Sequence, residues 1–124
     1  MKNPSILRIV SNVYSDDLEG SKEFYNAFLG MDLVMDMQWI LTFASGSNPT
    51  AQISILQNES GKPLRNEGVF ISIEVSDVDA LYENAIKRNL TIAYPITSEP
   101  WGVRRFFVKD PNGATLNILK HEEM

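Results

Sequence analysis

Hydrophobic and polar residues alternate along several short segments of this chain, and this pattern is typical of strands with one buried face. In residues 69–75 the β-branched set is Val69, Ile71, Ile73 and Val75. The intervening residues are Phe70, Ser72 and Glu74. In residues 114–119, Ala114, Leu116 and Ile118 alternate with Thr115, Asn117 and Leu119. Further strands are predicted over residues 33–37, 39–44, 51–56, 91–96 and 103–109.

Two segments instead carry apolar residues at helical spacing. Asp17 and Asp77 lie 60 residues apart, and each follows a predicted strand where a helix N-cap is expected. The apolar stripe of the first helix is Leu18, Phe24, Tyr25, Phe28 and Leu29, before Gly30 as the C-cap. The stripe of the second helix is Val78, Leu81, Tyr82, Ala85 and Ile86. The chain therefore reads as one module used twice.

Turn residues divide the predicted elements. Asp110, Pro111, Asn112 and Gly113 predict a tight turn, because proline presets φ and Asn-Gly tolerates positive φ. Residues 58–68 are polar, with two Gly and one Pro, and are interpreted as a linker. We expect a single domain over residues 1–124, with one module at about 5–57 and the other at about 69–121. Each module reads as a strand, a helix and three strands.

Composition narrows the classes of function. With 124 residues, 44% hydrophobic and 22% charged, the chain is predicted to be one soluble globular domain. It has no cysteine, which excludes disulfides and thiolate sites. A net charge of −5 argues against nucleic acid or an anionic membrane as the main partner. Without an apolar run of signal or membrane-spanning length, a cytoplasmic location is expected.

The turn at residues 110–113 and the strand after it resemble the closing hairpin of the glyoxalase/bleomycin-resistance/dioxygenase superfamily, also called the vicinal oxygen chelate fold. The resemblance extends over essentially the whole chain. It implies an α+β fold in which two βαβββ modules form a curved, mixed-sheet cup with helices outside. In metal-binding members a Glu follows the Asp of the turn by seven residues. Here that position is Asn117.

Alternation assigns side chains to the cup. In the first strand Leu7, Ile9 and Val13 are expected on the core side, which leaves Arg8, Val10 and Asn12 facing the cup. In the fourth strand Gln52 and Ser54 are expected to face the cup. The later strands contribute Phe70, Ser72, Glu74, Arg105, Phe107, Thr115, Asn117 and Leu119.

The resemblance implies one metal ligand in each of four strands. Those positions fall on Val10, about Ser54, Phe70 and Asn117, and none of these is a carboxylate or an imidazole. A divalent ion needs roughly three such ligands. The single histidine, His121, is interpreted as a surface residue after the last strand. We therefore expect no metal and no cofactor.

Catalytic constellations are sparse, because a chain without Cys and with one His lacks the parts of a nucleophilic triad. Glu74 beside Arg8 or Arg105 reads either as an acid/base pair or as a supporting salt bridge. Arg105 could also hold a ligand carboxylate or phosphonate. We predict no catalytic residue.

Aromatic residues are the remaining candidates. Trp101, between Pro100 and Gly102, resembles rim aromatics of antibiotic-binding members of the family. Trp39 and Phe43 share one face of their strand and line either the cup or the core. Phe106 is predicted to be core. The predicted ligand-binding residues are Arg8, Asn12, Trp39, Phe43, Ser54, Phe70, Trp101, Arg105, Phe107 and Asn117.

The leading hypothesis is a metal-independent binding protein of the bleomycin-resistance kind, associated with antibiotic resistance, that sequesters a planar or aromatic compound. The alternative is a lyase, isomerase or dioxygenase of the same fold with an atypical site, such as Glu74 with Asn117. A third reading is a scaffold with a filled cup. The resemblance also implies a homodimer, formed by exchanged modules or paired sheet edges.

Overall fold

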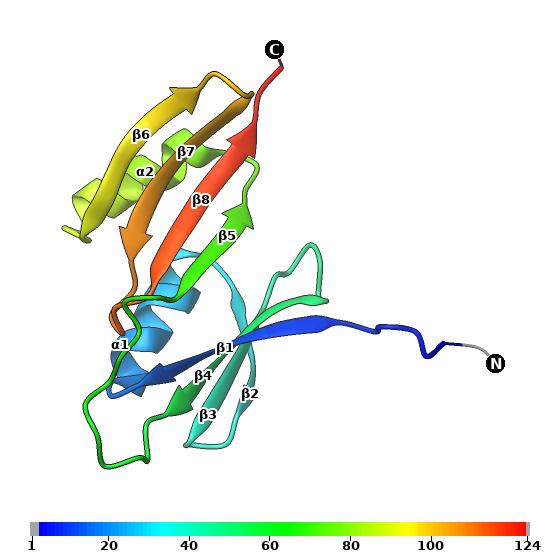
Figure 1. Cartoon of the computed structure of the whole chain (residues 1–124), viewed down its shortest axis with the longest axis vertical. Coiled ribbons are helices and arrows are strands. Elements are labelled where there is room, and N and C mark those ends of the chain that lie inside the picture. Colours follow the sequence, from blue (N-terminus) through cyan, green and yellow to red (C-terminus); the bar gives the residue numbers. More distant parts are fainter. Residues whose placement is uncertain (1–2, 124) are drawn as a thin grey trace. The chain divides into compact units, whose positions relative to one another are not determined.

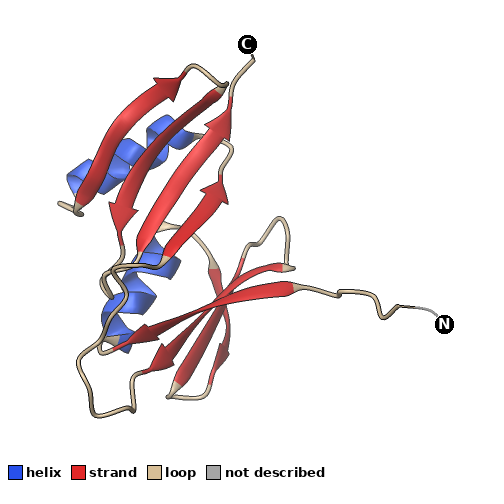
Figure 2. Ribbon diagram, in the orientation of Figure 1, coloured by secondary structure: helices blue, strands red, loops and turns tan. Residues whose placement is uncertain are grey.

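A computed structural model describes residues 3–123 of the chain. Two compact units make up the fold, and the boundary between them falls between Leu64 and Arg65. The boundary lies inside the polar segment 58–68. Each unit contains one four-stranded sheet and one helical segment, as Figures 1 and 2 show. The α+β class with two βαβββ modules is confirmed.

The first unit contains a helical segment and four strands. Its elements are β1 (Ile9–Ser15), α1 (Leu18–Lys22), a π-helical continuation η1 (Glu23–Phe28), β2 (Asp32–Asp36), β3 (Ile40–Ala44) and β4 (Ala51–Gln57). The strand order is β1-β4-β3-β2, with β1 parallel to β4 and the other pairs antiparallel. The mixed sheet expected for this module is thereby formed.

The second unit repeats the arrangement. Its elements are β5 (Phe70–Glu74), α2 (Val78–Lys87), β6 (Ile92–Glu99), β7 (Val103–Lys109) and β8 (Thr115–His121). The order β5-β8-β7-β6 reproduces the topology of the first unit, with β5 parallel to β8. In Figure 1, α2 lies along one face of this sheet.

The two helix starts have the predicted chemistry. The Asp17 carboxylate accepts a hydrogen bond from the Gly20 amide at 2.8 Å, and the Asp77 carboxylate accepts one from the Ala80 amide at 3.0 Å. A side-chain acceptor at the N-cap satisfies an amide that has no partner inside the helix. Gly30 has a φ of 74°, the left-handed conformation that suits glycine after a helix. The predicted caps are confirmed.

The first helix departs from a regular α-helix after one turn. Residues 23–28 form π-helical hydrogen bonds, which the apolar spacing does not predict. Phe24, Tyr25 and Phe28 are all buried, and the Tyr25 ring lies 5.5 Å from that of Phe43 on β3. These rings join the helical segment to the first sheet.

The first strand begins later than predicted. Leu7 and Ile9 are 84% and 76% exposed, so their assignment to the core was wrong. The reason is that β1 begins only at Ile9, where it pairs with Ala51, and the apolar cover over this face reaches Val13 but not the first residues. Arg8 therefore lies before the strand, where its Nη1 donates to Gln52 Oε1 at 3.2 Å.

The turn before β8 forms as predicted. The buried Asp110 carboxylate accepts from the amides of Asn112 and Ala114, each at 2.9 Å, and Gly113 has a φ of 89°. The Asn66 side chain donates to the Asn112 carbonyl at 3.0 Å. This contact attaches the start of the second unit to the turn.

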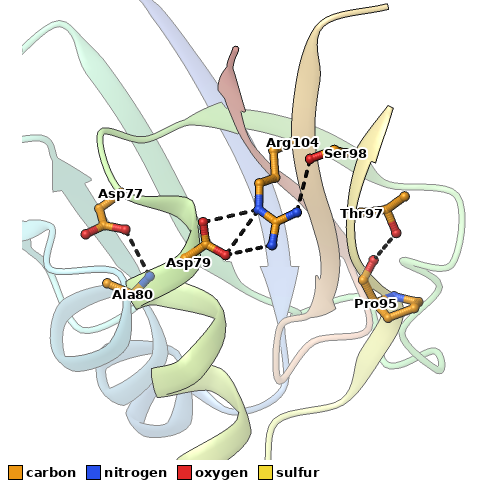
Figure 3. A network of polar contacts seen from close by, with 7 residues as sticks. All are labelled: Asp77, Asp79, Ala80, Pro95, Thr97, Ser98 and Arg104. Atoms are coloured by element: carbon orange, nitrogen blue, oxygen red, sulfur yellow. Dashed lines mark hydrogen bonds and ion pairs between the residues drawn. The ribbon is translucent and has the colours of Figure 1, made fainter. Parts of the chain in front are cut away.

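An ion pair ties α2 to its sheet. Arg104 of β7 donates to both carboxylate oxygens of Asp79 and, through Nη1, to Ser98 Oγ of β6 at 3.1 Å (Figure 3). Since Arg104 points toward the helix, its neighbours Arg105 and Val103 point to the opposite face of the sheet.

Candidate functional site

The two faces of the second sheet differ in their cover. Phe106, Val108, Leu116 and Ile118 are fully buried, and the Phe106 ring contacts Tyr82 of α2 at 5.0 Å between centroids. Phe106 is therefore core, as predicted. Side chains at the alternate positions lie on the other side of the sheet, which we call the helix-free face. Its members include Phe70, Lys109, Arg105, Phe107 and Asn117.

Three aromatic rings form a row on the helix-free face. The Phe107 ring lies 5.1 Å from Phe70, in an edge-to-face arrangement, and 4.9 Å from Tyr94. Ladder pairing explains the contact with Tyr94, because Tyr94 of β6 is the direct partner of Phe107. Phe70 remains 53% exposed. The row therefore crosses the sheet from β5 to β6, and its most exposed ring is Phe70 on the edge strand β5.

Arg105 lies among these rings. Its guanidinium carbon is 5.4 Å from the Tyr94 centroid, 5.2 Å from Trp101 and 4.9 Å from Phe107. A cation over aromatic faces is stabilised by the negative charge density of the rings. Trp101, which is 56% exposed, is thus attached to the edge of the aromatic row rather than buried in the core.

Glu99 compensates the charge of Arg105. The Arg105 Nη2 atom lies 2.8 Å from Glu99 Oε2, and Nε donates to the same oxygen at 2.9 Å. The Tyr94 hydroxyl donates to Glu99 at 3.2 Å. The expected alternative of a pair between Arg105 and Glu74 was therefore wrong. Glu99 lies beyond the predicted end of its strand, and the ladder shifts register twice between Ile92 and Thr97, so alternation does not find it.

Asn117 lies in the middle of the face, between Ser72 of β5 and Phe107 of β7 in the ladder. Its side-chain amide donates to Ser72 Oγ at 3.0 Å. The residue is only 7% exposed, and its Oδ1 atom accepts no hydrogen bond from any described residue. A buried acceptor without a donor costs about 1–3 kcal/mol of stability. Such an atom is a candidate contact for a ligand donor.

Lys109 is a member of the face that the sequence prediction omitted. Its Nζ donates to Thr115 Oγ1 at 2.6 Å, and Thr115 pairs in turn with Phe70. Alternation was sufficient to find it, because Lys109 has the same parity as Arg105 and Phe107. The face therefore carries a cation at the end of β7, two residues after Phe107 of the aromatic row.

Glu74 and His121 form a pair at the other end of the face. The Glu74 Oε2 atom lies 2.7 Å from His121 Nδ1. The hydrogen bond with His121 holds the pKa of Glu74 below its usual value. His121 is the last residue of β8 rather than part of a tail, because the strand is longer than predicted. Glu74 therefore pairs with His121 and not with Arg105 among the described contacts.

The predicted site residues of the first unit lie in different environments. Phe43 is fully buried against Tyr25, so it is a core residue and not a candidate ligand contact. Trp39 precedes β3 and is 48% exposed. Asn12 pairs with Ser54, whose hydroxyl shares a 2.7 Å hydrogen bond with Thr42. These residues form a polar row on the first sheet.

The positions aligned with the family's metal ligands do not fit a divalent ion. Val10 and Phe70 have no donor atom, while Ser54 and Asn117 offer only neutral oxygens. Within residues 3–123, no group of three or more His, Cys, Asp or Glu residues is close enough to hold a metal. In the same part of the chain, no helix is long and apolar enough to cross a membrane.

Comparison with known proteins gives one family. Residues 5–118 match the model of the Glyoxalase/Bleomycin resistance protein/Dioxygenase superfamily. No curated protein matches the chain.

Several solved structures share the fold. A glyoxalase/bleomycin resistance protein/dioxygenase from Nocardioides is 23% identical with a TM-score of 0.72, covering 99% of this chain and 87% of that one. A superfamily member from Sphaerobacter thermophilus DSM 20745 is 22% identical with a TM-score of 0.77, covering 94% and 98%. A lactoylglutathione lyase from Agrobacterium tumefaciens is 18% identical with a TM-score of 0.73, covering 96% of each chain. At these identities the likeness concerns the fold.

Proposed function

This chain belongs to the Glyoxalase/Bleomycin resistance protein/Dioxygenase superfamily, and on that basis we propose that it binds and sequesters a planar or aromatic small molecule without a metal. The proposed action resembles that of the bleomycin-resistance proteins in the same superfamily. The ligand would be held in stoichiometric amount and released unchanged. The single observation that supports this proposal most directly is the aromatic row of Phe70, Phe107 and Tyr94, with Trp101 at its edge.

Exposure makes this row a better candidate than an ordinary core cluster. Phe70 and Trp101 are more than half exposed, although burial of such large side chains is favourable. A ring stacked on an aromatic side chain gains about 0.5–1.5 kcal/mol beyond the burial of its area. With two or three such contacts and one hydrogen bond to Asn117, binding near −8 kcal/mol, or roughly micromolar, is reasonable.

The side chains at the positions of the superfamily's metal ligands support a binding function that does not need a metal. The superfamily's metal-dependent chemistry needs carboxylate or imidazole ligands, and the aligned positions here hold Val10, Ser54, Phe70 and Asn117. Ligand affinity is therefore expected to be the same before and after treatment with a chelator.

A panel of aromatic compounds, including planar antibiotics, tests the proposal by thermal shift, because a ligand that binds only the folded state raises the unfolding midpoint. Hits are then titrated by calorimetry against the Phe70→Ala variant. Ile86→Ala is the matched control, since Ile86 is an exposed apolar residue on α2. Weaker binding by Phe70→Ala alone supports the proposal. Equal binding by all three proteins contradicts it.

An enzymatic function is the alternative, and the pair of Glu74 and His121 is the observation in its favour. A carboxylate that orients an imidazole is a common acid/base device. Both side chains are largely exposed, however, with relative accessibilities of 59% and 67%. Since exposed pairs of this kind are ordinary on protein surfaces, we prefer the binding function. Turnover of a bound compound that is lost in Glu74→Gln would favour the enzyme.

A further inference from the structure

We propose that the ligand is an aromatic compound with an anionic group, and that Lys109 binds this group while the ring lies on Phe70 and Phe107. This inference rests on the proposed function and names the chemical class of its ligand. It is based on the charged residues of the helix-free face, because the aromatic row by itself does not indicate the charge of the ligand.

Lys109 carries an uncompensated charge. Its ammonium has three donors, and the contact given for it is the 2.6 Å hydrogen bond to the neutral Thr115 hydroxyl. No described carboxylate forms an ion pair with Lys109. The ion pairs given for the described residues join carboxylates to other basic side chains. A partly buried ammonium with donors to spare is well suited to bind a carboxylate or phosphate.

Arg105 is less suited to this role, although it is the cation that the sequence suggested. Its Nε and Nη2 atoms already contact Glu99, whose side chain is nearly buried. An anionic ligand group near Arg105 would be attracted by the guanidinium but repelled by the Glu99 carboxylate. The effects of these two charges on the group therefore largely cancel. Its position between rings indicates that Arg105 supports the aromatic surface instead.

Ladder register places the ammonium beside the ring-binding surface. Lys109 pairs with Thr115, and Thr115 pairs with Phe70, so the three residues form one row across the sheet. Phe107 lies two residues before Lys109 on β7 and contacts Phe70 at 5.1 Å. A ring on these two phenylalanines therefore has its substituent within reach of Lys109.

The opposite end of the face has the opposite charge. Glu74 lies four residues after Phe70 on β5, or about 13 Å away at the usual strand rise. It pairs with Leu119, far along the ladder from Thr115. An anionic ligand is therefore attracted to the Lys109 end and repelled from the Glu74 end, which sets its orientation.

Asn117 is a second, independent observation that points to a ligand on this face. It is more than nine-tenths buried, and its Oδ1 has no donor among the described residues. Asn117 is the ladder partner of Phe107 and lies two residues after Thr115. A polar group on the ring system would supply the missing hydrogen bond after a small side-chain adjustment.

The net charge of −5 does not decide against an anion. Charges further apart than about 8 Å are largely screened at physiological ionic strength, so the nearest groups dominate once the ligand is bound. The overall charge is expected to slow association of an anion rather than to set its final position.

Three probes with one ring system test the proposal: 2-naphthoate, 2-naphthamide and 2-naphthylmethylammonium. Calorimetric titration of the wild-type protein is expected to give the tightest binding for 2-naphthoate, about tenfold tighter than for the amide. The difference should shrink as salt is raised, because the contact is ionic. Weakest binding is expected for the cation.

Lys109→Met should remove the preference for the acid over the amide, while Lys109→Arg should retain it. Lys120→Met is the matched control, since Lys120 lies on the neighbouring strand β8 and pairs with Arg104, on the face of the sheet that carries α2. If Lys109→Met does not fold, Lys109→Gln replaces it.

The outcomes separate the two proposals. If all three probes bind equally well, the inference is overturned and the proposed binding function stands. A preference for the acid that survives in Lys109→Met overturns the assignment to Lys109. If no naphthyl probe binds, both proposals are overturned. A preference that is lost in Lys109→Met but kept in Lys109→Arg and Lys120→Met supports the inference.

Discussion

Trp101 and Phe106 illustrate how position, rather than residue type, decides what an aromatic side chain does in this protein. Phe106 is fully buried against Tyr82 of α2, whereas Trp101 is more than half exposed at the start of β7. Five residues apart, they belong to opposite environments. The larger ring is the one left in contact with solvent, where a ligand can reach it.

Trp101→Ala is therefore expected to affect binding more than stability. Loss of one stacking contact should weaken an aromatic ligand about tenfold, or ~1.4 kcal/mol. The unfolding free energy should fall by only about 0.5–1 kcal/mol, through loss of the contact with the Arg105 cation. Calorimetric titration and urea unfolding measure the two effects.

Phe106→Ala is the comparison variant, because truncation of a buried ring should cost about 3–5 kcal/mol of unfolding free energy. A loss of that size in Trp101→Ala would mean that Trp101 is a core residue. The scaffold reading would then be favoured over ligand binding.

Asn117→Leu should separate stability from function. The change removes a buried acceptor that has no donor, and it leaves the exposed Ser72 hydroxyl free to bond to water. We expect the unfolding free energy to stay unchanged or to rise by up to about 1 kcal/mol, while ligand affinity falls. Ser72→Ala is the control for the lost hydrogen bond. Destabilisation of Asn117→Leu by several kcal/mol would indicate a purely structural role.

At the scale of elements, α2 is held to its sheet by the contact between Asp79 and Arg104 (Figure 3). Hydrogen bonds from the Arg104 guanidinium hold the pKa of Asp79 below its ordinary value of 3.8. A carboxylate with a lowered pKa stabilises the fold above its unfolded pKa, and this contribution is lost as pH falls through the folded pKa.

Arg104→Met should therefore destabilise the protein at pH 7, and the difference from wild type should start to shrink below about pH 4 and disappear only below the lowered pKa of Asp79. Its size at pH 7 is expected to be below about 1 kcal/mol, because the Asp79 side chain is 57% exposed and solvent screens the pair. Thermal unfolding between pH 2 and pH 7 measures it, with Lys87→Met as a control on α2. A difference independent of pH would assign the effect to packing instead.

Also at the scale of elements, some features follow from local sequence and others do not. The caps at Asp17 and Asp77 and the turn at Asp110 are predictable because their hydrogen bonds form within a few residues. The π-helical turns of η1 are not, since they accompany the packing of Phe24, Tyr25 and Phe28 in the core. Strand ends are also set by pairing, so β8 continues to His121 while β1 begins only at Ile9.

For the whole molecule, the donor set predicts that the purified protein holds no stoichiometric divalent metal. None of Val10, Ser54, Phe70 and Asn117 supplies an anionic or imidazole ligand. Elemental analysis after desalting is expected to find well below one zinc, iron, nickel or manganese per chain. About one retained ion per chain would contradict this expectation.

We also expect a homodimer. Each sheet ends in strands with a neighbour on one side in the described part of the chain, β1 and β2 in one unit and β5 and β6 in the other. Exposed edges favour pairing with another chain. The apolar segment before β1 adds to this, since Ile6 and Leu7 are almost fully exposed. Light scattering should give twice the chain mass of 14.0 kDa at micromolar concentration.

Leu7→Asp should weaken the dimer if this segment lies in the interface, whereas Ile86→Asp on α2 serves as the control for added charge. A wild-type mass of 14.0 kDa at micromolar concentration would contradict the expectation.

The amino-acid sequence by itself determined the repeated module, the helix starts and the parity that separates Phe106 from Phe107, because these depend on short-range periodicity and local hydrogen bonds. Only the tertiary structure decided the partners across the second sheet. The bulges in β6 break its alternation and bring Glu99 to Arg105, which cancels the charge of the expected anion contact. Pairing of β7, β8 and β5 instead sets Lys109 beside Thr115 and Phe70, a proximity that depends on the register of three strands.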